Sequence, residues 1–211
     1  MQRFLAAGLL AASGALFLTG AAGAATITKS PDLGNYWSPL SSIGTYVYAN
    51  SFIASATGAV TDLGIWLKGG SSSVVFEILA DIAGAPNGAG ILTKTAVQSF
   101  SLGALTFEHA APLSSATLLA GQKYWFAAST VGLSGSGSYN VGGHTQNSGG
   151  IIDGGTFWYS NDRAGLSFDG QRLTPEMAFS VTIHDVPEPA SIALLGTGML
   201  GLGMLRRRTI A

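Results

Sequence analysis

The sequence predicts an all-β domain, an antiparallel sandwich or barrel, and three observations lead to this expectation. Hydrophobic residues in the central part alternate with a period of two, as in strands that bury one face. The apolar runs are short and are separated by Gly, Ser, Asn or Pro. Only 10% of the 211 residues are charged, against about 25% in an average domain. Ser, Thr and Gly replace them, which disfavours helices with charged solvent faces.

Ten segments carry the strand pattern. In the third of them, Val74, Phe76 and Ile78 share one face, and the residues between them share the other. In chain order the segments are Thr45–Phe52, Val60–Lys68, Ser73–Ala80, Ala96–Leu102, Leu105–His109, Ala116–Ala120, Lys123–Ser129, Thr156–Ser160, Leu166–Phe168 and Met177–Ile183.

Two loops are predicted between these strands. Asp81–Gly90 contains Pro86-Asn87-Gly88, which is a strong turn signal. Gly132–Gly155 is rich in Gly, Ser and Asn and mostly lacks a strand pattern. A loop of that length in a compact domain is expected to be functional or mobile.

The order of several short motifs resembles the bacterial surface domains known as choice-of-anchor domains of the R type. The motifs are FEILAD, GAPNGAGIL, LLAGQKYWFAAS, WYSND and MAFSVTI. This resemblance implies a jelly-roll-like antiparallel sandwich over most of residues 45–183, and it implies no activity.

The N-terminal residues 1–24 have the three parts of a secretory signal peptide. Arg3 supplies the positive charge, Phe4–Leu18 form an uncharged apolar stretch, and Ala22-Gly23-Ala24 provide small residues of the A-x-A kind. We expect cleavage after Ala24 and export across the inner membrane. An uncleaved N-terminal anchor is the alternative.

The C-terminal residues 186–211 combine prolines, an apolar run and a basic cluster. Val186, Pro187, Glu188 and Pro189 form an extended linker, because proline lacks a backbone N–H and restricts the residue before it. Residues 190–205 carry no charge. As a transmembrane helix they would be about 24 Å long, against a hydrocarbon core of about 30 Å. Three arginines, Arg206, Arg207 and Arg208, would then hold the end on the cytoplasmic side.

This tail resembles the PEP-CTERM sorting signal of Gram-negative bacteria, which has the same three parts in the same order. The resemblance implies that a membrane enzyme, exosortase, recognises Pro187-Glu188-Pro189 in a membrane-held precursor and releases or transfers the body. It also implies an association with exopolysaccharide and biofilm systems, at the cell surface or in the matrix. A permanent membrane anchor and a buried core helix are the alternatives.

The body, residues 25–185, has six basic and ten acidic residues and no cysteine. The absence of cysteine excludes disulfides, thiolate metal ligands and a cysteine nucleophile. The weakly acidic balance gives no basic face for nucleic acid, so no nucleic-acid partner is expected.

Catalytic motifs are missing from the body. His109, His144 and His184 are not spaced as metal ligands, and the sequence has no HExxH, no G-x-S-x-G and no phosphate loop. We therefore expect no enzyme activity and no cofactor.

Three aspartates in one region leave two alternatives open. Asp153, Asp162 and Asp169 could serve a glycosidase or bind Ca²⁺ through loop carboxylates. Aspartates in Gly-rich turns more often form Asx turns.

Adjacent aromatic residues are the remaining lead. Trp158 and Tyr159 would face opposite sides of a strand, and an outward ring beside Asn161 and Asp162 could contact a glycan. The alternative is that both rings fill the core or its edge. The sequence thus predicts a non-enzymatic exported protein associated with extracellular polysaccharide. The alternatives are a carbohydrate-binding module at the cell surface and a permanently anchored domain.

Overall fold

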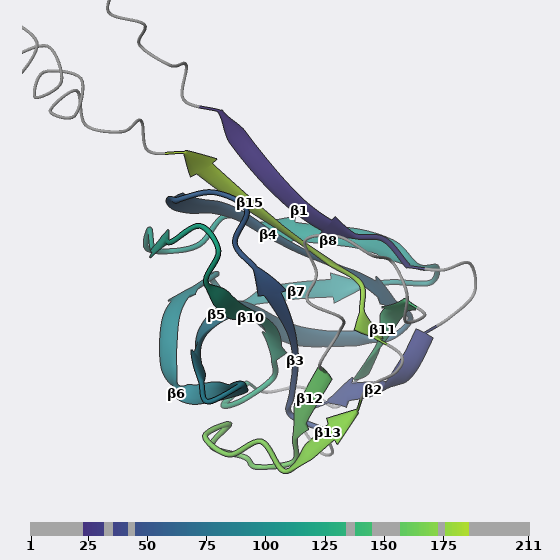
Figure 1. Cartoon of the computed structure of the whole chain (residues 1–211). Helices are drawn as coiled ribbons and strands as arrows, with labels where there is room; N and C mark the ends of the chain where they lie inside the picture. The colour runs from purple at the N-terminus through teal and green to yellow at the C-terminus, as the bar shows by residue number, and fades with distance from the viewer. Residues whose placement is uncertain are drawn as a thin grey trace, which may run out of the picture. The chain divides into compact units, whose positions relative to one another are not determined.

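The computed structural model describes residues 23–31, 36–41, 45–133, 138–144, 157–172 and 176–185. These residues fall within one compact unit made of two antiparallel sheets (Figure 1). In this part of the chain no helix is long and apolar enough to cross a membrane. The predicted transmembrane helix 190–205 and the leader up to residue 22 lie outside the described residues.

The two sheets contain eight and seven strands. Sheet A consists of β1 (Ala24–Lys29), β2 (Tyr36–Ser41), β4 (Gly58–Lys68), β8 (Thr106–Ala110), β9 (Thr117–Leu118), β11 (Ser138–His144), β14 (Glu176–Met177) and β15 (Phe179–Asp185). Sheet B consists of β3 (Val47–Ile53), β5 (Ser71–Ile82), β6 (Ala85–Lys94), β7 (Gln98–Ser101), β10 (Lys123–Ser129), β12 (Phe157–Ser160) and β13 (Gly170–Arg172).

The strand pairs are nested along the chain. The outermost pair is β1 with β15, followed inward by β3 with β10, β4 with β8, and β5 with β6 and β7. Two further ladders, β15 with β4 and β10 with β5, join these pairs into the sheets. Nested pairing distributed over two sheets is the jelly-roll arrangement, so the predicted jelly-roll-like sandwich is confirmed.

The main core lies between the sheets and is rich in aromatic rings. Phe126 of sheet B stacks on Phe179 of sheet A with ring centroids 5.0 Å apart and an interplanar angle of 10°. Phe52 also contacts Phe179. All three side chains are fully buried. Burial of apolar area of this kind supplies the main driving force for folding, and the chain has no cysteine that could add a disulfide.

Several predicted boundaries were wrong. The hairpin between β5 and β6 turns at Ala83-Gly84, where both φ angles are positive (52° and 86°), as a two-residue hairpin turn of type I′ requires. Pro86-Asn87-Gly88 therefore lies inside β6 and does not form the turn.

Two further segments differ from the expectation. Leu166–Phe168 belongs to a loop, because its backbone N–H groups bond to a nearby aspartate instead of a neighbouring strand. Conversely, the long loop predicted at 132–155 contains strand β11. Strands β1, β2, β6 and β13 were not predicted from the sequence.

Candidate functional site

The predicted glycan-contact residues lie on β12 and the loop that follows it. Trp158 and Tyr159 face opposite sides of sheet B, as alternation predicts, and both are half-buried. Tyr159 packs against the main core between the sheets. Trp158 packs on the outer side of sheet B against a second cluster. The buried members of this second cluster are Tyr46, Val47, Ala49, Leu79, Trp125 and Ala127.

Asn161 and Asp162, which follow these two rings in the chain, hold the loop 161–169 in place. The side chain of Asp162 accepts hydrogen bonds from the backbone N–H groups of Ala164 (2.9 Å), Leu166 (3.2 Å) and Ser167 (3.3 Å). These bonds, the one from Ala164 foremost, hold the pKa of Asp162 below its usual value. Asn161 accepts a hydrogen bond from the Thr45 hydroxyl. The bond from the Ala164 N–H to the carboxylate of Asp162, two residues earlier, is that of an Asx turn. Glycan contact at this loop stays a prediction.

Calcium binding at the same aspartates also stays a prediction. The carboxylate of Asp169 accepts the backbone N–H of Asn161, and Asp153 lies outside the described residues. Within the described ranges, no group of three or more His, Asp or Glu side chains could hold a metal ion.

The outer face of sheet B is covered by other parts of the body. The hairpin of β5 and β6 curls over it (Figure 1). Gly88 lies so close to the loop 161–169 that a Cβ there would stand 2.2 Å from the Gly165 carbonyl oxygen. Beneath this cover, Trp125 is fully buried and its Nε1 donates a hydrogen bond of 2.8 Å to Asp81.

One carboxyl group under this cover has a strongly shifted pKa. Glu77 lies on the outer face of β5 and is buried. Burial raises its pKa to about 7, and the nearby positive charge of Lys94 only partly opposes that rise. The Glu77 carboxyl group therefore keeps its proton until about neutral pH.

The outer face of sheet A, in contrast, displays hydroxyl groups. Along β1, Ile27 and Lys29 are buried while Thr26 and Thr28 are exposed. Along β15, Phe179, Val181 and Ile183 face the core, so Ser180 and Thr182 lie on the opposite side of the strand, where Ser180 is buried and Thr182 half-buried. We call Thr26, Thr28, Ser180 and Thr182 the hydroxyl face.

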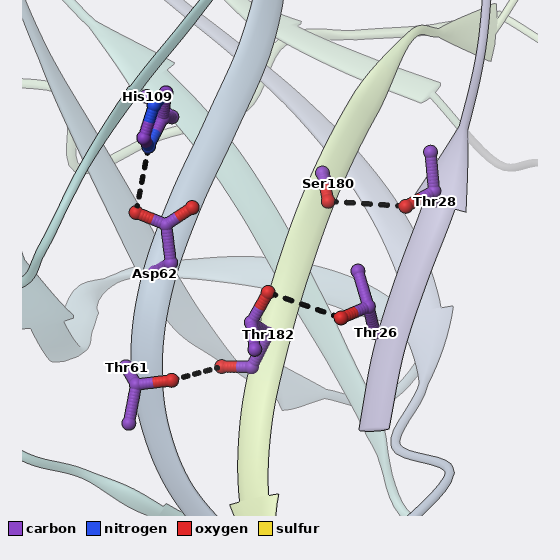
Figure 2. Close-up of polar contacts among 7 residues, drawn as sticks. All are labelled: Thr26, Thr28, Thr61, Asp62, His109, Ser180 and Thr182. Atoms are coloured by element: carbon purple, nitrogen blue, oxygen red, sulfur yellow. Dashed lines mark hydrogen bonds and ion pairs between the residues drawn. The ribbon is translucent and has the colours of Figure 1, made fainter. Parts of the chain in front are cut away.

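The hydroxyl groups pair across the ladder of β1 and β15 (Figure 2). Thr26 Oγ1 lies 3.3 Å from Thr182 Oγ1, and Thr28 Oγ1 lies 3.1 Å from Ser180 Oγ. Each hydroxyl can donate one hydrogen bond and accept two. A pair that shares one bond therefore keeps further donor and acceptor capacity, which the exposed Thr26 and Thr28 can offer to a ligand.

Aromatic rings adjoin the hydroxyl face on β4 and β8. Trp66 and Phe107 are cross-strand partners with ring centroids 4.4 Å apart, and His109 stacks on Phe107 at 5.6 Å and 10°. We call Trp66, Phe107 and His109 the aromatic stack. The Phe107 ring lies over Gly64, where an added Cβ would come within 2.3 Å of it. Glycine at this position thus lets the ring lie flat on the sheet.

One acid–base pair lies between the hydroxyl face and the aromatic stack. Asp62 of β4 is the register partner of Thr182, and its Oδ1 lies 3.1 Å from Nδ1 of His109 (Figure 2). The His109 side chain is 60% exposed and that of Asp62 is 33% exposed. The outer face of sheet A therefore combines an exposed ring, neutral hydroxyls and one carboxylate in a single surface.

Sequence reasoning missed this surface. The alternation Thr-Ile-Thr at residues 26–28 and Ser-Val-Thr at residues 180–182 was a usable signal for two faces. The adjacency of these segments depends on the pairing of the first strand with the last, and local pattern does not reveal that pairing.

The comparison with known families concerns the C-terminal segment. The sequence profile of the PEP-CTERM protein-sorting motif matches residues 185–208. The match includes the predicted processing residues 186–189 and the arginine cluster 206–208, which lie outside the described residues. No curated protein matches the chain. The resemblance of the body to choice-of-anchor domains stays a prediction. The chain therefore carries a PEP-CTERM sorting motif, and it is an exported protein whose membrane-associated precursor is processed by exosortase.

Proposed function

We propose that the exported body is a non-enzymatic component of extracellular polysaccharide, and that it binds the polymer through the outer face of sheet A. The observation that carries this proposal is the hydroxyl face beside the aromatic stack. Sorting through a PEP-CTERM motif supports a location at the cell surface or in the matrix.

The chemistry of the surface matches that of a neutral glycan. A sugar ring has apolar C–H faces and a rim of hydroxyls. Phe107 is 37% exposed and offers a flat apolar ring. The Thr and Ser hydroxyls can both donate and accept, so they can bond a sugar rim in either sense.

The distribution of charge also supports an uncharged ligand. The hydroxyl face contributes no charge, and Asp62 is paired with His109. A strongly anionic polymer would call for a cluster of Arg or Lys side chains. The surface is therefore better suited to a neutral polysaccharide than to a polyanion.

The side chains on the outer face of sheet A support glycan binding without catalysis. Hydrolysis of a glycosidic bond requires two carboxyl groups on either side of the bond, roughly 5 to 9.5 Å apart. In the described part of the outer face, Asp62 is a single carboxylate and it is engaged by His109. This arrangement supports a role in holding a glycan.

The test is co-sedimentation of the protein, purified from the culture medium, with a panel of insoluble neutral polysaccharides. We expect Phe107→Ala to weaken binding at least tenfold, which corresponds to about 1.4 kcal/mol. Leu166→Ala removes an apolar side chain that is even more exposed (59%) from the loop of sheet B, and it should leave binding unchanged.

Trp158→Ala distinguishes the two candidate surfaces. Loss of binding in Trp158→Ala but not in Phe107→Ala, with thermal stability retained in both, would transfer the glycan site to β12. Tight binding to one defined polysaccharide would favour the carbohydrate-binding module. Failure to bind any polymer of the panel would refute the proposal.

Intact mass of the protein from the membrane and from the medium tests the third possibility. We expect the chain in the medium to end between Val186 and Pro189. A mass extending to Ala211 in the membrane fraction, with none released, would identify a permanent anchor.

A further inference from the structure

A lysine and a glutamate are buried together where β1 ends and the last strands of the body begin. Along β1 the buried positions are Ile27 and Lys29, which share one face of the strand. Lys29 is the register partner of Phe179, the first residue of β15, and Glu176 lies just before it in β14. Lys29 Nζ forms an ion pair with Glu176 Oε2, and the two side chains are 2% and 3% exposed. Lysine and glutamate are rarely buried to this degree.

The strands around this pair carry apolar side chains. Ile27, Met177 and Phe179 are its neighbours along β1, β14 and β15, and all three belong to the main core between the sheets. Within the described residues, Glu176 Oε2 accepts no hydrogen bond that would supplement the ion pair. The desolvation of two charges in such a place can exceed their mutual attraction. A neutral link between the same two side chains would remove this cost.

We propose that Lys29 and Glu176 condense into an intramolecular amide once the body has folded. A proton passes from the Lys29 ammonium to the Glu176 carboxylate, which gives an amine and a carboxylic acid. The Nζ lone pair then attacks Cδ, so that a new N–C bond forms and the bond from Cδ to the hydroxyl oxygen breaks. That oxygen leaves as water with the acid proton and one proton of the amine. No electron is transferred, and no further reactant is consumed.

The fold supplies what this condensation needs. It holds the amine against the carboxyl group, so that two groups far apart in the sequence react as if each were highly concentrated. Their burial keeps bulk water away, which favours the loss of water and the neutral product. The unfolded chain offers neither condition, so the amide forms only in the folded body.

An amide at this position would fasten a strand that is otherwise held on one side. Among the described strands, β1 pairs with β15 alone and lies at the edge of sheet A. The body has no cysteine for a disulfide. The loop closed by an amide between residues 29 and 176 contains nearly the whole body, and cross-links that close long loops restrict the unfolded chain most. The inference does not depend on glycan binding.

The test is a tryptic peptide map of the full protein purified from the culture medium. Trypsin cuts after Lys29 and after Arg172 in a chain without the amide, so Lys29 and Glu176 then appear in separate linear peptides. The amide blocks the cut at Lys29 and joins the two peptides. We expect nearly all of the protein to give this linked species, with a mass lower by one water than the sum of its two chains.

Lys29→Arg is the matched variant, because arginine keeps the positive charge of the ion pair and does not form the amide. Its peptides should be linear, and its midpoint of thermal unfolding should lie about 10 °C below that of the natural protein. Lys123→Arg makes the same exchange on β10 and should keep both the linked species and the natural midpoint.

Linear peptides from the folded natural protein would overturn the inference and leave Lys29 and Glu176 as a buried ion pair. This result needs no substitution, so the test holds even where Lys29→Arg fails to fold. A linked species of the same abundance in Lys29→Arg would overturn it as well, because the link would then lie elsewhere in the two peptides.

Discussion

The outer faces of the two sheets differ in what lies above them. Both carry aromatic side chains placed outward by strand alternation, Trp125 and Trp158 on sheet B and Phe107 on sheet A. On sheet B the β5–β6 hairpin and the loop 161–169 close over the rings and form a second small core. On sheet A, among the described residues, no such cover closes over Phe107, His109, Thr26 and Thr28, which stay exposed. Strand alternation thus sets the side of the sheet on which a ring lies. The surrounding loops determine whether that ring is buried and stabilises the fold, or stays exposed and available to a ligand.

The largest loss of folding stability is expected from removing the ring of Trp125, which lies under the cover of sheet B. Trp125→Ala deletes a fully buried indole and removes the hydrogen bond that the indole donates to Asp81 Oδ1. We expect the free energy of unfolding to fall by about 3–5 kcal/mol. Urea denaturation measures this loss. A loss below about 1 kcal/mol would mean that the covered face is not a second core.

A pH-dependent effect should come from Glu77 on the same face. The folded protein keeps this proton to about pH 7, whereas the unfolded chain releases it near pH 4.5. The folded state therefore binds the extra proton between these values, and its free energy of unfolding falls as the pH rises from 4.5 to 7. The difference corresponds to about 3 kcal/mol.

Denaturation of the natural protein and of Glu77→Gln at pH 5 and pH 8 measures this dependence. The amide cannot ionise, so the variant should lose this part of the pH dependence and be the more stable protein at pH 8. Parallel pH curves for the two proteins would show that Glu77 is ionised under its cover.

The smallest effect on stability is expected on the open face. Thr26→Val removes one member of an exposed hydroxyl pair and keeps the β-branched shape. We expect stability to change by less than about 0.5 kcal/mol, while polysaccharide binding weakens a few-fold. Thermal unfolding and co-sedimentation of the same samples separate the two. A large loss of stability would place the hydroxyl face among the structural elements.

Sequence pattern predicted the elements whose signal is local. The strand KYWFAAS was placed at Lys123–Ser129, where the structure has β10, because aromatic and alternating residues follow a glycine turn. The β5–β6 turn was misplaced, because Pro-Asn-Gly is the stronger local signal and the ladder nevertheless turns at Ala83-Gly84. Register with the partner strand overrode the local preference.

The candidate surface could not be predicted from one segment. Its hydroxyls come from β1 and β15, which are separated by 149 residues between Lys29 and Phe179, the last pair of their ladder. The opposite directions of Trp158 and Tyr159 were predicted correctly. The cover over Trp158 depends on a hairpin and a loop from elsewhere in the chain, so the sequence left open whether that ring was accessible.

The nested pairing has a consequence for the timing of export. Strand β15 lies between the edge strand β1 and β4, so sheet A has a gap beside its edge strand until the last strand of the body arrives. A chain that leaves the membrane with its N-terminus first must translocate almost completely before this gap can be filled. Such long-range pairing is slow, and the unfinished sandwich presents open strand edges meanwhile. A sorting tail that starts at the end of β15 would keep each chain beside the membrane until the sandwich is complete.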